Sequence, residues 1–200
     1  MDEAINHFRV NISRVKEIGG LYEALSNLTT SIVDSTDLLR TQIVMTVSAL
    51  DHYIHEITRK GILEIYAGTR PPTETYSKFQ VSMETLQGVT SGGSGPMLLE
   101  NEIHEKHSYL SFQHPDKIAD AIRLFFVKPL WKEVADRVAM PTNDVKNRLK
   151  LIIERRNKIA HEADMDPSYP GVRWPITKAD VLGTISFIEK ICNEIHFIVT

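Results

Sequence analysis

Arg156, Asn157 and His161 lie close together in the stretch RRNKIAHEAD, residues 155–164. Histidine is the side chain whose proton moves most readily near neutral pH, so His161 is a candidate general acid or base. Arginine carries a permanent charge on a planar fork that matches phosphate oxygens, so Arg156 is a candidate clamp for a phosphate group. Asn157 can hydrogen-bond either the phosphate or the imidazole. Together, these residue types predict a site that transfers a proton while it holds a phosphate ester.

The three residues fall on different sides of one predicted helix, which runs from about residue 142 to about residue 163. The apolar side chains of this helix share one arc, which contains Val145, Leu149, Ile152 and Ile153. At about 100° per residue, Arg156 falls near the centre of that arc, and His161 lies about 140° away from it. A buried charge is costly unless it is paired. Arg156 therefore needs a carboxylate partner, a water-filled cleft or a second subunit.

This helix also concentrates basic residues, which the chain as a whole does not. The formal net charge is -3, so any site for a polyanion must come from a local group of Lys and Arg residues. The stretch from residue 146 to residue 158 is rich in both and holds one acidic residue, Glu154. The candidates for contacts with a polyanion are Lys146, Lys150, Arg155 and Lys158.

A second irregularity occurs in the long helix predicted for residues 36–66, where apolar residues recur every three or four positions. Asp51 intrudes on its apolar face, and His55 follows one turn later at the border. A carboxylate and a guanidinium on facing helices remove each other's desolvation penalty. We therefore predict that Asp51 contacts Arg156 or orients His161, with His55 beside it in a supporting role. The alternative is a satisfied core ion pair without chemistry.

The remaining pattern predicts an all-α bundle that forms one domain over residues 1–200, with a core of about 36–66 and 115–198. A first helix covers residues 2–28 and is expected to break or fray at Gly19 and Gly20. Residues 73–110 are expected to form an irregular insertion of short helices with a flexible loop at about 88–97. Further helices are predicted at 115–129 and 130–138, then one capped by Thr142 or Asn143, and a last one with capping-box spacing at Thr177 and Asp180.

Composition narrows the class of protein. Hydrophobic residues make up 42% of the chain and charged residues 24%, values typical of a soluble globular protein. The single cysteine, Cys192, excludes an internal disulfide and suits a reducing compartment. No stretch has the apolar length of a signal peptide or a membrane span. We therefore expect a cytoplasmic protein with no membrane association.

Two histidine pairs have helical spacing that could bind a metal ion, His52 with His55 and His104 with His107. The sequence HEKH is not the HExxH motif, and no clear further ligand accompanies either pair. We therefore predict neither a metal site nor a cofactor. Two acidic residues downstream, Asp164 and Asp166, are expected to cap or solvate the loop after residue 163.

The spacing Arg-x4-His from Arg156 to His161 resembles the signature of the HEPN superfamily, all-helical proteins of which many are metal-independent ribonucleases. The resemblance extends to the RiboL-PSP-HEPN branch and covers most of residues 36–195. It is carried by collinear segments: TDLLRTQIVMTVSALDHYIHEI, SFQHPDKIADAIRLF, RRNKIAHEADMDP and WPITKADVLGTISFIEKI. One short motif alone would be weak evidence, but collinear segments are specific.

This resemblance implies RNA cleavage by attack of the 2′-hydroxyl, with Arg156 as phosphate clamp, His161 as acid or base and Asn157 assisting. It also implies a homodimer that sets the two motifs face to face, which would close the gap between Arg156 and His161. A toxin or effector of a bacterial defence or toxin-antitoxin system, restrained by an antitoxin or regulatory protein, is the role expected. The alternatives are a non-catalytic helical dimer that binds RNA or a partner protein, and nucleotide or tRNA-end binding without cleavage.

Overall fold

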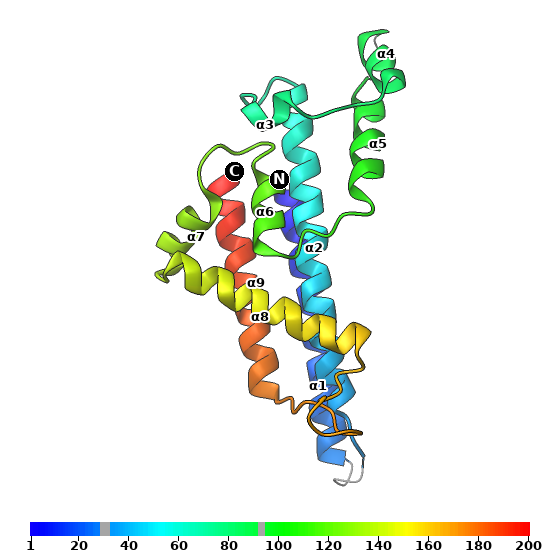
Figure 1. Cartoon of the computed structure of the whole chain (residues 1–200), viewed down its shortest axis with the longest axis vertical. Coiled ribbons are helices and arrows are strands. Elements are labelled where there is room, and N and C mark those ends of the chain that lie inside the picture. Colours follow the sequence, from blue (N-terminus) through cyan, green and yellow to red (C-terminus); the bar gives the residue numbers. More distant parts are fainter. Residues whose placement is uncertain (29–32, 92–94) are drawn as a thin grey trace.

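The computed structural model describes residues 1–28, 33–91 and 95–200, and helices dominate these residues. Two long helices, α1 (Asp2–Leu28) and α2 (Thr36–Tyr66), run side by side, and α9 (Lys178–Val199) packs against both (Figure 1). In the described part of the chain, the only β-bridge joins Met165 and Arg173. The all-α prediction is confirmed. None of the described helices is long and apolar enough to cross a bilayer.

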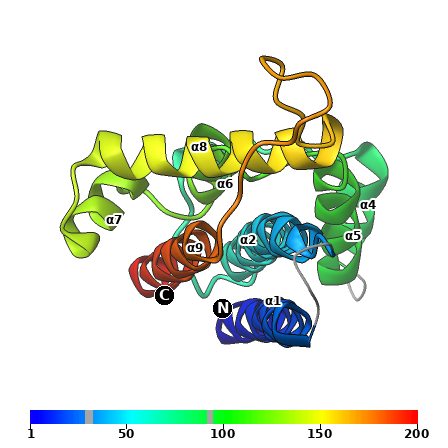
Figure 2. The ribbon, with the colours of Figure 1, turned by 90° about the horizontal axis from the view of Figure 1, so that it is seen from below.

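The helix that carries the predicted site, α8 (Thr142–His161), crosses over α2 and α9 on the side opposite α1 (Figure 2). Its contacts with α2 and with α7 (Leu130–Val138) hold it there. The main apolar core lies between these layers, and the buried face of α2 runs through it. The deepest side chains of α2 in this core are Leu39, Val47, Leu50, Tyr53, Ile54 and Ile57. Each fully buried side chain of this size contributes about 1.5–3 kcal/mol to the bundle.

The first helix is continuous, so the predicted break at Gly19 and Gly20 is wrong. A Cβ atom at Gly19 would lie 2.8 Å from Nε2 of Gln42, whose buried amide donates a hydrogen bond to the Val15 carbonyl oxygen at 3.0 Å. Gly19 therefore allows a side chain of α2 to approach the backbone of α1. The glycine marks a close contact between two helices and does not interrupt one of them.

The insertion consists of α3 (Glu74–Ser77), α4 (Met83–Ser91) and α5 (Gly95–His107). A flexible loop was predicted at 88–97. Of these residues, 88–91 belong to α4 and 95–97 to α5, while 92–94 lie outside the described residues. A Cβ atom at Gly88 would overlap Leu98, and one at Gly95 would contact the hydroxyl of Tyr66. These glycines serve close helix packing, which sequence alone does not distinguish from a turn.

Helix ends follow the sequence in part. The capping box at Thr177 and Asp180 is confirmed, with both reciprocal hydrogen bonds formed. The helix α6 (Pro115–Ile122) begins at Pro115 as predicted but ends earlier than expected, because the following turn directs Phe125 into the core against Gly61. The predicted caps of α8 are wrong: Pro141 occupies the N-cap position and accepts backbone hydrogen bonds, so Thr142 is already helical.

Candidate functional site

The last turns of α8 leave the protein core, and Arg156 lies where they do so. The predicted apolar arc is confirmed by burial of Val145, Leu149, Ile152 and Ile153. Nearly two turns later, Ile159 is only partly buried, and Ala160 is exposed. Arg156 is therefore half-buried at the margin of the core, where a charged group retains access to solvent.

The guanidinium of Arg156 is held by two amide side chains. Its Nη2 donates to Oε1 of Gln113, and its Nη1 donates to Oδ1 of Asn157 at 3.0 Å. The buried Gln113 in turn donates from Nε2 to Oδ2 of Asp51 at 2.9 Å. A carboxylate only accepts and a guanidinium only donates, so the two partners fix the orientation of the Gln113 amide between them.

The predicted contact between Asp51 and Arg156 or His161 is therefore wrong as stated. Among the described residues, the carboxylate of Asp51 accepts from Gln113 and from the Phe112 backbone N–H at 2.6 Å, and it lies 3.8 Å from Nε2 of His55. The segment before α6 inserts Gln113 between the two helices, so the carboxylate reaches the guanidinium through an amide. No periodicity marks this short segment, which is why helical spacing alone missed Gln113.

His55 does lie beside Asp51, as its position in the sequence predicted. Its ring also contacts that of Phe112, with centroids 4.4 Å apart. Burial lowers the pKa of His55, and the nearby Asp51 carboxylate acts in the opposite direction. Because burial prevails, the pKa of His55 is lowered and its neutral form is favoured.

His161 is the last residue of α8 and is exposed. Its imidazole forms no hydrogen bond or ion pair with the described residues. Asn157, which could have oriented it, bonds to Arg156 instead. Within one chain, hydrogen bonds thus fix the orientation of the Arg156 guanidinium, whereas no hydrogen bond from the described residues fixes the rotamer of His161.

The predicted polyanion-binding residues differ in how free they are. Nη2 of Arg155 donates to Asp164 at 2.8 Å and to the Pro175 carbonyl oxygen at 3.2 Å, so this side chain acts as an internal anchor. Lys146 pairs with Asp116 at the surface, 2.7 Å away. Lys158 and Lys150 also remain near the surface, with the Lys158 ammonium 5.0 Å from the ring centroid of Trp174. We retain the three lysines as candidates and assign Arg155 a structural role.

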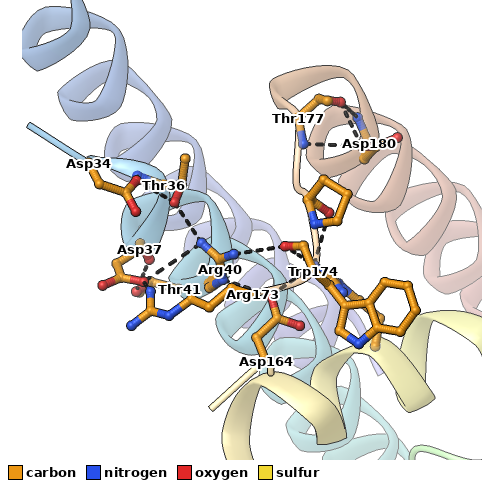
Figure 3. A network of polar contacts seen from close by, with 12 residues as sticks. Asp34, Thr36, Asp37, Arg40, Thr41, Asp164, Arg173, Trp174, Thr177 and Asp180 are labelled. Atoms are coloured by element: carbon orange, nitrogen blue, oxygen red, sulfur yellow. Dashed lines mark hydrogen bonds and ion pairs between the residues drawn. The ribbon is translucent and has the colours of Figure 1, made fainter. Parts of the chain in front are cut away.

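The loop after α8 is anchored by a buried carboxylate (Figure 3). Oδ2 of Asp164 accepts from Nε of Arg40 at 2.7 Å and from Nη2 of Arg155 at 2.8 Å, and the Asp164 side chain is 0% exposed. The Asp164 N–H donates to the Lys158 carbonyl, and the Asp164 carbonyl accepts from the Trp174 N–H, both at 2.9 Å. This network, called here the Asp164 anchor, fixes the C-terminal end of α8.

Asp164 and Asp166 were both expected to cap or solvate this loop, but the side chain of Asp164 is buried and pairs with two arginines. Asp166 does cap a turn, since its Oδ1 accepts from the Ser168 N–H at 2.9 Å. Asp164 instead lies beneath the loop because the buried Arg40 of α2 needs a counter-charge. The sequence feature that could have predicted this ion pair is Arg40, a charged residue beside the apolar face of the second helix.

A model of the RiboL-PSP-HEPN family matches residues 9–199 of this chain. The chain belongs to the RiboL-PSP-HEPN family. The matched residues extend from α1 to α9. They therefore include the insertion formed by α3, α4 and α5. Comparison with curated proteins and with solved structures gave no match. These comparisons assign no role to Arg156 or His161.

Proposed function

We propose that this RiboL-PSP-HEPN protein is a metal-independent endoribonuclease in which Arg156 holds the scissile phosphate and His161 transfers the proton. The observation that carries the proposal is the fixed Arg156 guanidinium. Gln113 and Asn157 each take one N–H, and the other donors have no partner among the described residues. A fork that is already oriented loses little entropy when it binds phosphate oxygens.

The reaction uses the 2′-hydroxyl of RNA as nucleophile. A base removes its proton, the 2′-oxygen bonds to phosphorus, and the bond from phosphorus to the 5′-oxygen breaks as an acid protonates that oxygen. The products are a 2′,3′-cyclic phosphate and a 5′-hydroxyl end. Histidine suits both proton transfers, and arginine stabilises the charge that develops on the phosphoryl oxygens. DNA lacks the nucleophile and is not cut.

A homodimer would bring together Arg156 and His161, which point in different directions within one chain. Arg156 and His161 point about 140° apart around an ideal helix, and His161 has no orienting partner in the described residues. The loop that follows α8 exposes Met165, Tyr169 and Val172 beside this end of the helix. A second copy related by two-fold symmetry would cover these side chains and bring its His161 toward Arg156.

Cleavage of total RNA by the untagged protein in EDTA tests the proposal. We expect Arg156→Ala and His161→Ala each to lower the cleavage rate by roughly 100-fold or more, because each removes a charge or a proton-transfer group. The matched control is His7→Ala, which removes an exposed histidine from α1. Wild-type protein that leaves RNA intact, or His161→Ala protein that cuts at the wild-type rate, would contradict the proposal.

Mixing the two inactive variants tests whether the site is shared. If Arg156 of one chain acts with His161 of the other, a heterodimer of Arg156→Ala and His161→Ala contains one intact site. Random exchange makes half of the dimers mixed, so activity should return to about a quarter of the wild-type value. Mixtures that remain inactive while heterodimers form would show that the site belongs to a single chain.

The cellular role proposed is that of a toxin or effector in a bacterial defence or toxin-antitoxin system. Expression should arrest growth, and His161→Ala should relieve the arrest. A protein that binds RNA without forming product would instead indicate the non-catalytic dimer. An antitoxin or regulatory partner would be recognised as a protein whose co-expression restores growth without altering the amount of the wild-type protein.

A further inference from the structure

A pocket between α2 and α5 brings together two histidine pairs that are far apart in the sequence. Its volume is about 280 Å³, close to the lower limit of about 300 Å³ for pockets that bind small molecules. Both α5 and the C-terminal end of α8, which carries Arg156, lie on the same side of α2 (Figure 1 and Figure 2). The pocket is lined by His52, His55, Glu56, Arg59, Ile103, His104, His107 and Ser108.

Two imidazole rings of the pocket are held in place by a neighbouring phenyl ring. The centroid of the Phe112 ring lies 4.4 Å from that of His55 and 5.3 Å from that of His107. His107 is buried, as is Ile103 one turn before it on α5, so the inner wall of the pocket is largely apolar. The bases of single-stranded RNA stack on aromatic side chains of this kind, including histidine. Because these rings are already packed, little ordering is needed when a base binds.

The charges of the pocket favour a neutral base over a phosphate group. Its guanidinium, that of Arg59, is already paired with Glu56 at 2.7 Å and with Glu100. Two carboxylates thus offset this cation and leave little positive charge to attract a phosphate. Glu56 itself lines the pocket, and a carboxylate oxygen accepts hydrogen bonds from the N–H groups at the edge of a base. The pocket therefore offers stacking surfaces and a hydrogen-bond acceptor, which are the contacts that recognise bases.

A short series of contacts connects the pocket to Arg156. The guanidinium of Arg156 donates to Gln113, and Gln113 donates to Asp51 at 2.9 Å. Asp51 in turn lies 3.8 Å from Nε2 of His55, which lines the pocket. A chain segment follows the same route, since Ser108 lines the pocket and Gln113 lies five positions later, at most about 18 Å away. An RNA strand whose phosphate binds Arg156 therefore has the pocket within reach of a nearby base.

We propose that this pocket binds one nucleobase of the RNA strand whose scissile phosphate Arg156 holds, an inference that rests on the ribonuclease function proposed above. The base lies between the histidines of α2 and those of α5, against the rings of His55 and His107. His52 and His104 are exposed at the rim and form no hydrogen bond in the described part of the chain, so they can turn toward the base. A base held there fixes the register of the strand and thereby selects the phosphate that reaches Arg156.

Fluorescence anisotropy with nine-nucleotide 2′-O-methyl RNAs that contain all four bases tests the pocket without cleavage, because these strands lack the nucleophile. Each base is removed in turn to leave an abasic sugar. For the wild type, we expect one position at which loss of the base weakens binding by roughly tenfold or more. In the His52→Ala, His104→Ala double variant, the same change should weaken binding by less than about threefold. His7→Ala, which removes an exposed histidine outside the pocket, should behave as the wild type does.

Cleavage gives a second readout. In maps of the 5′-hydroxyl ends made from total RNA, the wild type should prefer one base at a fixed distance from the cut, and the double variant should lose that preference. Both substitutions remove exposed side chains, so urea unfolding of the double variant should match that of the wild type.

The binding assay separates failure of the pocket from failure of the nuclease. Equal abasic losses in the wild type and the double variant, or no position that depends on its base, would overturn the pocket and leave the ribonuclease proposal standing. A base-dependent position that requires the two histidines, in a protein that cuts no RNA, would support the pocket and contradict the ribonuclease.

Discussion

Replacing Asp164 with asparagine should destabilise the protein by about 3–5 kcal/mol, because it removes one charge from a buried ion pair. The oxygen concerned accepts charge-assisted hydrogen bonds from Arg40 and Arg155 at 2.7 Å and 2.8 Å. Each such bond contributes about 1.5–3 kcal/mol. The Arg40 side chain is only 8% exposed, so without its counter-ion it would keep a costly buried charge. Its bonds to Thr36 and to the Trp174 carbonyl keep the expected loss near the lower end.

Asparagine isolates the effect of charge. It has almost the same shape as aspartate and tolerates the left-handed backbone at this position, where φ is +58°. The measurement is urea-induced unfolding followed by circular dichroism. The matched control is Asp166→Asn in the same loop, because Asp166 caps a turn and pairs with no cation in the described residues. We expect this control to cost less than about 1 kcal/mol.

Equal stability of the two variants would refute the reasoning. It would mean that Arg40 finds water or another acceptor at no cost, and that the Asp164 anchor contributes nothing net to folding. A loss confined to Asp164→Asn should also lower the melting temperature by roughly 6–20 °C, since 1 kcal/mol corresponds to about 2–4 °C in a chain of this size.

Gln113→Leu keeps the volume of the side chain but removes the bridge to Arg156, so it should lower RNA cleavage by roughly 10-fold to 100-fold; an unchanged rate would show that the bridge does not position the guanidinium. Gly61→Ala should destabilise the protein by about 1–3 kcal/mol in urea unfolding, because the added Cβ would overlap Phe125. Gly20→Ala is the matched control. Its Cβ meets open space, so this variant should be stabilised by about 0.5–1 kcal/mol. Cys192 is fully buried and its pKa is raised by burial, so a thiol reagent should modify it only after unfolding; rapid labelling of the native protein would contradict its placement.

The parts of the fold that follow from local chemistry were predictable. The apolar spacing of residues 36–66 requires a helix with one buried face, and α2 has these bounds. Thr177 and Asp180 are close enough in sequence to form their capping box without help from the rest of the chain. In both cases the interacting groups belong to one helix, so their spacing determines the outcome.

What the sequence did not predict depends on contacts between distant segments. Gln113 is a single polar residue in a short connection, and its role exists only because α2 and α8 lie on either side of it. Arg40 and Asp164 form an ion pair across 124 positions of the chain, which no local pattern reports. Glycines were ambiguous for the same reason, since Gly19 and Gly88 permit close packing where sequence alone suggested flexibility.

The adjacent arginines of α8 bind different partners. Arg155 donates to Asp164 in the Asp164 anchor, and Arg156 donates to Gln113. They are separated by about 100° around the helix axis. Inserting one residue upstream in α8 would rotate the end of the helix by that angle, so that Arg155 would take the place of Arg156, and Arg156 that of Asn157. This helix should therefore tolerate many substitutions on its solvent side but no change of length. Any relative that preserves both sets of hydrogen bonds should have the same number of helical residues before the two arginines.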